Sequence, residues 1–166
     1  TLDGKAGYCI AIDIGARRLG LILTDLNNEI ISRQSIPISR QAFSHVYQQI
    51  YLAIDKLIRD IPPCPYGLIG ISLAVRGIID LDGVIRFIPK LQWHNIDIKS
   101  LLEQRYHVPV YIDNDGNLAA SMESRLHPQY EELTVLCITD VISCGMISNG
   151  QLIRGYLGFA NAVGHH

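Results

Sequence analysis

The sequence comprises 166 residues, of which 48% are hydrophobic and 18% are charged, and its formal net charge is −2. This length suffices for one compact domain, or for one complete lobe with part of a second. The composition excludes a disordered, fibrous or low-complexity chain. Because the fourteen Lys and Arg residues are dispersed along the chain, the basic surface that nucleic-acid binding requires is missing.

Membrane insertion and secretion are not expected either. No apolar run approaches the roughly 20 residues of a membrane-spanning helix, and the first residues lack the layout of a signal peptide. The four cysteines are scattered without a C-x-x-C pair, which indicates reduced, structural thiols. We therefore expect a soluble, cytoplasmic protein with no membrane partner. A start without Met and an end at His165-His166 suggest a fragment or a tagged end.

The first part of the chain predicts three strands and a helix. The strands are expected at 7–14, 19–25 and 29–37, because these segments are rich in β-branched residues and short turns join them, which favours an antiparallel meander. Between Ser39 and Ile61 the apolar residues recur every three or four positions. This spacing places them on one face of a helix that ends before two prolines.

The rest of the chain alternates between strands and helices. The segment 67–75 is almost continuously apolar, as in a strand buried on both faces, and Asp82-Gly83 is typical of a hairpin turn. Helices are expected at 97–106 and 116–126, strands at 108–113, 133–138 and 142–147, and a further hairpin at Asn149-Gly150. The order predicts an α/β fold with the connectivity of a ribonuclease-H-like lobe. We expect this lobe at 1–130 and the beginning of a truncated second lobe at 131–166.

Three groups of residues carry a resemblance to a known family. They are Arg76-Gly77-Ile78-Ile79-Asp80, Pro89-Lys90-Leu91-Gln92-Trp93, and Asn114-Asp115-Gly116-Asn117-Leu118-Ala119-Ala120 followed by Glu123. Together with an Asp-x-Gly turn at Asp13 and Gly15 and the segment from Gly158 to His165, these motifs resemble the ROK family of repressors and sugar kinases. The resemblance covers essentially the whole chain and implies the actin/hexokinase (ASKHA) fold.

The resemblance also assigns roles to individual residues. In family kinases the residue matching Asp115 is the general base that deprotonates the sugar hydroxyl, although an Asp between a strand and a helix is also a good N-cap. Asn114 and Gly77 match sugar contacts, and Trp93 could stack on a sugar or pack in the core. His165 matches a sugar contact and a zinc ligand whose three cysteine partners lie beyond this chain. We therefore expect no metal or cofactor here, and zinc only in a full-length form.

The sequence departs from the kinase pattern at both phosphate-binding turns. Gly15 is followed by Ala16-Arg17-Arg18 instead of Gly-Thr, and the second loop retains one glycine, Gly145, while Asp140 adds a negative charge. Successive main-chain amides converge on an anion only where glycines allow it. We therefore interpret Asp13, Gly15, Asp140 and Gly145 as degenerate phosphate loops, with Asp115 as the remnant of a catalytic base. The sequence predicts a protein that is not an enzyme.

The predicted function is that of a sugar-sensing effector domain of a ROK-type transcriptional regulator. Its expected effector is a sugar or sugar phosphate held by Arg76, Gly77, Asn114, Asp115 and His165. DNA would be bound only through an N-terminal winged helix absent from this chain, and the resemblance implies a homo-oligomer. Arg76 replaces a proline, and its guanidinium would favour an anionic sugar unless it points to solvent or pairs with Asp80. Two alternatives remain: a divergent ATP-dependent hexose or N-acetylhexosamine kinase, and a scaffold domain that binds no sugar.

Overall fold

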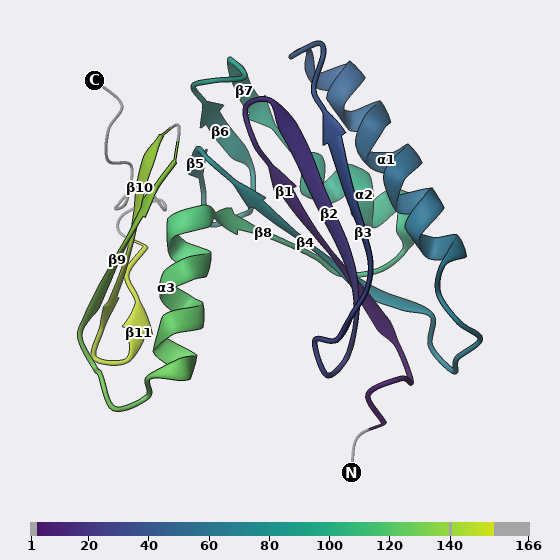
Figure 1. Ribbon diagram of the computed structural model, residues 1–166. Helices are drawn as coiled ribbons and strands as arrows, with labels where there is room; N and C mark the ends of the chain where they lie inside the picture. Colours follow the sequence, from purple (N-terminus) through teal and green to yellow (C-terminus); the bar gives the residue numbers. More distant parts are fainter. Residues whose placement is uncertain (1–2, 140, 155–166) are drawn as a thin grey trace. The chain divides into compact units, whose positions relative to one another are not determined.

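The computed structural model describes residues 3–139 and 141–154. The chain divides into two compact units. The first contains residues up to 73 together with 98–112, and the second contains residues 74–97 and those from 113 onward. Figure 1 traces the elements of both units along the chain. The predicted boundary between a lobe at 1–130 and a second lobe at 131–166 is a different division and stays a prediction.

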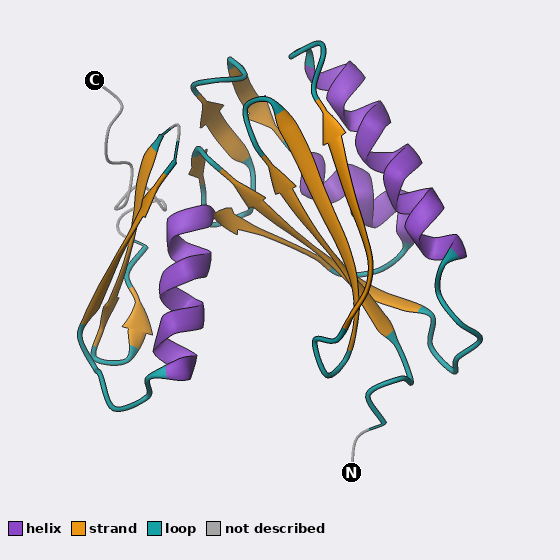
Figure 2. Cartoon of the chain, viewed as in Figure 1, coloured by secondary structure: helices purple, strands orange, loops and turns teal. Residues whose placement is uncertain are grey.

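The first unit is built on a mixed sheet (Figure 2). The predicted meander is confirmed, because β1 (Tyr8–Ile14), β2 (Arg18–Asp25) and β3 (Ile30–Pro37) pair in antiparallel fashion in chain order. β4 (Leu68–Val75) and β8 (Val110–Asn114) complete a five-stranded sheet of order β3-β2-β1-β4-β8. The carboxyl ends of β4 and β8 lead into the second unit.

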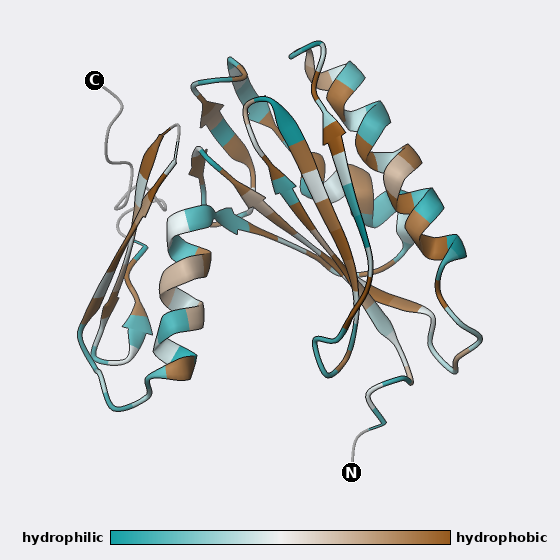
Figure 3. Ribbon diagram, viewed as in Figure 1, coloured by the Kyte–Doolittle hydropathy of each residue, from teal (hydrophilic) through white to brown (hydrophobic). Residues whose placement is uncertain are grey.

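Alternation of side chains between the two faces of the sheet makes the core of the first unit. Ile10 pairs with Leu23 and Ile12 with Leu21, and all four are buried, whereas the residues between them are half-buried. Figure 3 colours the middle of both strands mainly as hydrophobic.

Two helices belong to the first unit. The predicted apolar stripe of α1 (Phe43–Arg59) is confirmed, with Val46, Ile50, Ile54 and Leu57 buried. The helix packs against β2 and β3. α2 (Ile98–Tyr106) is linked to it by the Tyr106 hydroxyl, which lies 2.8 Å from Asp55 Oδ1.

The second unit contains a small antiparallel sheet of β5 (Ile78–Ile79), β6 (Ile85–Ile88) and β7 (Trp93–Ile96). The predicted hairpin around Asp82-Gly83 is confirmed, but β7 was not predicted, because it is short and its two central residues are exposed and polar. Trp93 is only 3% exposed, so it packs in the core and does not offer a ring for sugar stacking.

The second unit also contains a helix and a hairpin. α3 (Asp115–Leu126) packs against β9 (Leu133–Ile138) and β10 (Ile142–Ser148). β11 (Gln151–Leu152) pairs with β10 across Asn149-Gly150, whose φ angles of 50° and 71° confirm the predicted tight turn. None of the helices in the described part of the chain is long and apolar enough to cross a membrane.

Candidate functional site

The Asn114-Asp115 turn lies where β8 ends and α3 begins. Asn114 has an extended backbone (φ −65°, ψ 143°), and its side-chain Oδ1 accepts the main-chain N–H of Gly116 at 2.8 Å. Asn114 is therefore the N-cap of α3, and the interpretation of Asp115 as the cap is wrong. Asp115 is the first helical residue, where its negative charge is favourable next to the positive end of the helix dipole.

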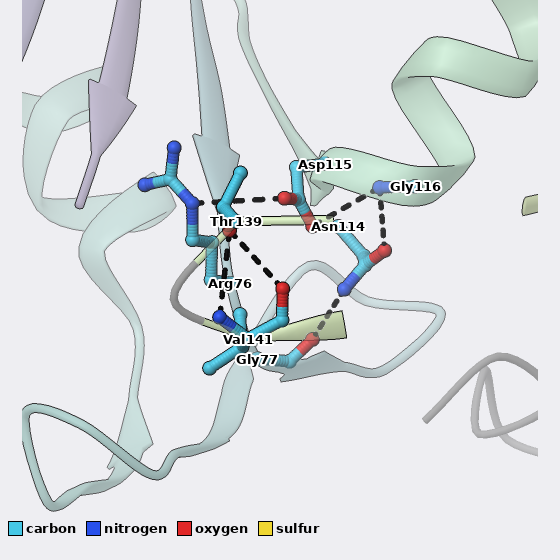
Figure 4. Close-up of polar contacts among 7 residues, drawn as sticks. All are labelled: Arg76, Gly77, Asn114, Asp115, Gly116, Thr139 and Val141. Atoms are coloured by element: carbon cyan, nitrogen blue, oxygen red, sulfur yellow. Dashed lines mark hydrogen bonds and ion pairs between the residues drawn. The ribbon is translucent and has the colours of Figure 1, made fainter. Parts of the chain in front are cut away.

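Gly77 meets this turn from the segment after β4. The side-chain amide of Asn114 donates from Nδ2 to the Gly77 carbonyl oxygen at 3.0 Å (Figure 4). A Cβ at Gly77 would overlap the main-chain carbonyl of Phe87, so the backbone of β6 explains why this residue is glycine. The structure thus places Asn114 and Gly77 next to each other, as the sequence predicts. The contact between them is a direct hydrogen bond.

Arg76 lies against Asp115. Its Nε is 3.7 Å from Asp115 Oδ2, and the two side chains are 19% and 15% exposed, respectively (Figure 4). Asp80 pairs instead with Arg86, whose Nε is 2.7 Å and whose terminal nitrogen is 2.6 Å from Asp80 Oδ2. Both alternatives considered for Arg76, a solvent-facing side chain and an ion pair with Asp80, are therefore wrong.

Asp113 is a buried residue that holds the Asn114-Asp115 turn in place. It was not identified from the sequence. It is 1% exposed, and its Oδ1 accepts the main-chain N–H of Asn114 and the side-chain amide of Asn117, both at 2.8 Å. Its other oxygen forms an ion pair with Arg154. A buried carboxylate needs such partners to offset its lost hydration. The available signal was an acidic residue that directly follows the apolar core of a strand.

The first predicted phosphate turn lies in the first unit. Asp13 is half-buried and pairs in register with Gly20 on the face of the sheet opposite Ile12 and Ile14. The main-chain N–H of Gly15 donates to the carbonyl of Arg18 at 3.0 Å and so closes the β1–β2 hairpin.

The second predicted phosphate turn joins β9 and β10 in the second unit. The main-chain N–H of Thr139 donates to the Val141 carbonyl at 3.0 Å, and the Thr139 hydroxyl donates to the same oxygen at 3.1 Å (Figure 4). Gly145 lies further along β10, where a Cβ would overlap the Gly116 carbonyl and crowd Ala120. Its close contact with α3 accounts for this glycine without any phosphate.

The pKa of Cys137 in β9 is affected by charged residues of the same region. Burial raises the pKa of its thiol, and the Asp115 carboxylate raises it further, whereas the nearby Ser143 hydroxyl and the Arg76 guanidinium oppose the rise. The thiol therefore lies within electrostatic reach of the Arg76–Asp115 ion pair.

Two predicted site residues, Asp140 and His165, lie outside the described residues. Within residues 3–139 and 141–154, no three His, Cys, Asp or Glu side chains gather as a metal ion would require. Arg76, Asn114 and Asp115 combine hydrogen-bond donors and acceptors. Such a combination suits the hydroxyl groups of a sugar.

The fold and these residues define an α/β protein of the actin and hexokinase type. The comparison with family models matches residues 9–166 to the ROK family. This chain is 36% identical to a xylose repressor of Bacillus subtilis over 99% of its own length and 44% of the repressor. It is 26% identical to a glucokinase of Halalkalibacterium halodurans over 95% of its own length and 49% of the kinase.

A solved structure shares the same fold. A ROK family transcriptional regulator, a homologue of the E. coli MLC protein, superimposes with a TM-score of 0.82 at 15% identity, over 93% of this chain and 40% of the regulator. The chain belongs to the ROK family, as its motifs predict. It spans about half the length of the curated relatives it matches.

Proposed function

We propose that the protein is the effector-binding part of a ROK-family transcriptional regulator. In this proposal a sugar shifts the equilibrium between states that differ in DNA affinity. The DNA itself is bound by a winged helix elsewhere in the polypeptide, which acts as a cytoplasmic homo-oligomer. The matched repressor is named for xylose, so D-xylose is the first effector to test.

The observation that carries the proposal is the reversal between β9 and β10. A loop that holds phosphate directs several main-chain N–H groups at the anion, and successive glycines make this possible. Here Thr139 directs both its N–H and its hydroxyl to the Val141 carbonyl within the reversal itself. In contrast, Asn114 and Asp115 keep the residue types that contact sugar in the family. The combination supports sugar binding without phosphoryl transfer.

Operator binding by the full polypeptide tests this proposal. The probe is a fluorescent duplex from the region upstream of its own gene, and binding is followed by anisotropy at physiological salt. We expect specific binding that falls at least tenfold in the presence of D-xylose or another neutral sugar of a small panel. The 166-residue chain alone should not bind this duplex, because its net charge is −2. Failure of every sugar to change operator affinity would refute the proposal.

The second candidate function is an ATP-dependent sugar kinase. It is favoured by the similarity to a glucokinase and by Asp115, which the family resemblance matches to the kinase base. A coupled assay of ADP release with hexoses, N-acetylhexosamines and D-xylose separates the two functions. We expect no sugar-dependent turnover above that of an Asp115→Ala control. Clear turnover that this substitution abolishes would establish the kinase instead.

A further inference from the structure

Residues 3–6 form a reverse turn that leads into β1, and we call it the entry turn. The main-chain N–H of Ala6 donates to the Asp3 carbonyl at 3.0 Å, and the N–H of Lys5 donates to Asp3 Oδ1 at 3.0 Å. An aspartate whose side chain accepts an N–H two residues further on is typical of such turns. These two bonds give the entry turn a defined backbone conformation.

The entry turn is attached to the turn between β2 and β3. The Gly4 carbonyl accepts the main-chain N–H of Leu26 at 2.9 Å. Gly4 is buried, and a Cβ at this position would overlap the side chain of Asn27. This close approach explains why residue 4 is glycine.

The β2–β3 turn has support of its own. Asp25 is only 2% exposed, and its Oδ1 accepts the N–H of Asn27 at 2.8 Å and that of Glu29 at 2.9 Å. The N–H of Asn28 donates to the Asp25 carbonyl at 3.2 Å and so closes a reverse turn. None of these bonds involves the entry turn, so the β2–β3 turn provides it with a fixed support.

A second attachment joins the entry turn to the chain just before β4. The N–H of Tyr66 donates to the Ala6 carbonyl at 3.0 Å, and the N–H of Tyr8 donates to the Gly67 carbonyl at 2.8 Å. β4 is the neighbour of β1 on the side opposite β2, so the entry turn is held from both sides of β1. Two separate attachments fix the direction of a segment as well as its position, whereas a single one would let it pivot.

We infer that the entry turn is a rigid connection that sets the orientation of the preceding polypeptide relative to the sheet of the first unit. The inference rests on the proposed function, with the winged helix on the N-terminal side of residue 3, as the sequence predicts. An oligomer that contacts two half-sites must hold its recognition helices at the spacing of the operator. A rigid connection provides this spacing in advance, whereas a flexible linker must be ordered on binding, at a cost in affinity.

Leu26→Pro tests the rigid connection in the full polypeptide. Residue 26 is the second residue of the reverse turn, where proline is favoured, so the substitution keeps the turn and removes the N–H that Gly4 accepts. Leu26→Ala is the matched control, because it removes the same side chain and keeps this N–H. We expect Leu26→Pro to bind the operator duplex at least tenfold more weakly than Leu26→Ala, measured by fluorescence anisotropy. Calorimetric titration with D-xylose should not distinguish the two variants, because residue 26 lies outside the candidate site.

Gly4→Ala guards against a failure of Leu26→Pro to fold, which thermal unfolding would reveal. Its Cβ would overlap the Asn27 side chain, so we expect weaker operator binding by Gly4→Ala and recovery in the double variant Gly4→Ala/Asn27→Ala. If the parent binds the operator and the variants of either pair bind it equally well, the rigid connection is refuted and the regulator stands. If the parent itself does not bind the operator, the regulator is refuted, and the inference that rests on it is refuted too.

Discussion

The substitution Gly145→Ala tests whether this glycine is required for close packing against α3 or is only a remnant of a phosphate-binding loop. The Cβ of Gly145→Ala would overlap the Gly116 carbonyl and approach the Ala120 side chain. Because the main obstacle is the backbone of α3, it cannot be relieved by rotating a flexible side chain. Overpacking of this kind costs about 3 kcal/mol, at the upper end of the usual range. At roughly 2–4 °C per kcal/mol for a chain of this size, the expected fall in Tm is about 6–12 °C.

Thermal and urea unfolding followed by circular dichroism measure this loss, with Gly20→Ala as the matched control. At Gly20 an added Cβ would meet only the Asp13 Cβ at 3.8 Å, an ordinary contact, and alanine in a strand is favoured over glycine by about 0.5–1 kcal/mol. We therefore expect Gly20→Ala to be as stable as the parent or slightly more so. If the two variants have the same free energy of unfolding, the close contact between α3 and β10 does not explain the glycine.

Three further predictions concern buried polar groups. Burial raises the pKa of Tyr106 above its ordinary value of 10.0, and the hydrogen bond with Asp55 raises it further. The protonated hydroxyl therefore contributes stability that is fully present below pH 10 and is lost as pH rises through the higher native pKa. Tyr106→Phe should therefore flatten the alkaline fall in the free energy of unfolding above about pH 10; parallel curves would contradict this. Because the Asp115 carboxylate raises the pKa of Cys137, Asp115→Asn should accelerate alkylation of that thiol by iodoacetamide at pH 8, followed by peptide mass spectrometry; an unchanged rate would argue against the coupling. Asp113→Ala should lower the free energy of unfolding in urea by about 1–3 kcal/mol, because the Asn114 N–H and the Asn117 side-chain amide lose their buried acceptor; an unchanged free energy of unfolding would show that Asp113 does not anchor the turn.

The secondary structure and the family were both readable in the sequence, because their signals are local. Segments rich in β-branched residues and joined by short turns predict the strands of the meander, and the spacing of three and four residues predicts α1. The hairpin turn at Asn149-Gly150 requires positive φ angles, which only a few residue types adopt readily. It could therefore be assigned without knowing which strands pair. The short strand β7 carried no such signal, since His94 and Asn95 at its centre are polar and exposed.

The contacts within the candidate site could not be predicted from local sequence patterns. Asn114 and Asp115 are both good capping residues, so only the backbone angles decide that Asn114 caps α3 and Asp115 faces Arg76. The partner of Arg76 lies far along the chain, and a nearer carboxylate, Asp80, is taken by Arg86. The sequence by itself determined which residue types occupy the Asn114-Asp115 turn, because motifs record residue identity. Only the tertiary structure decided which charges neutralise one another, because ion pairs depend on distances in space that no local pattern contains.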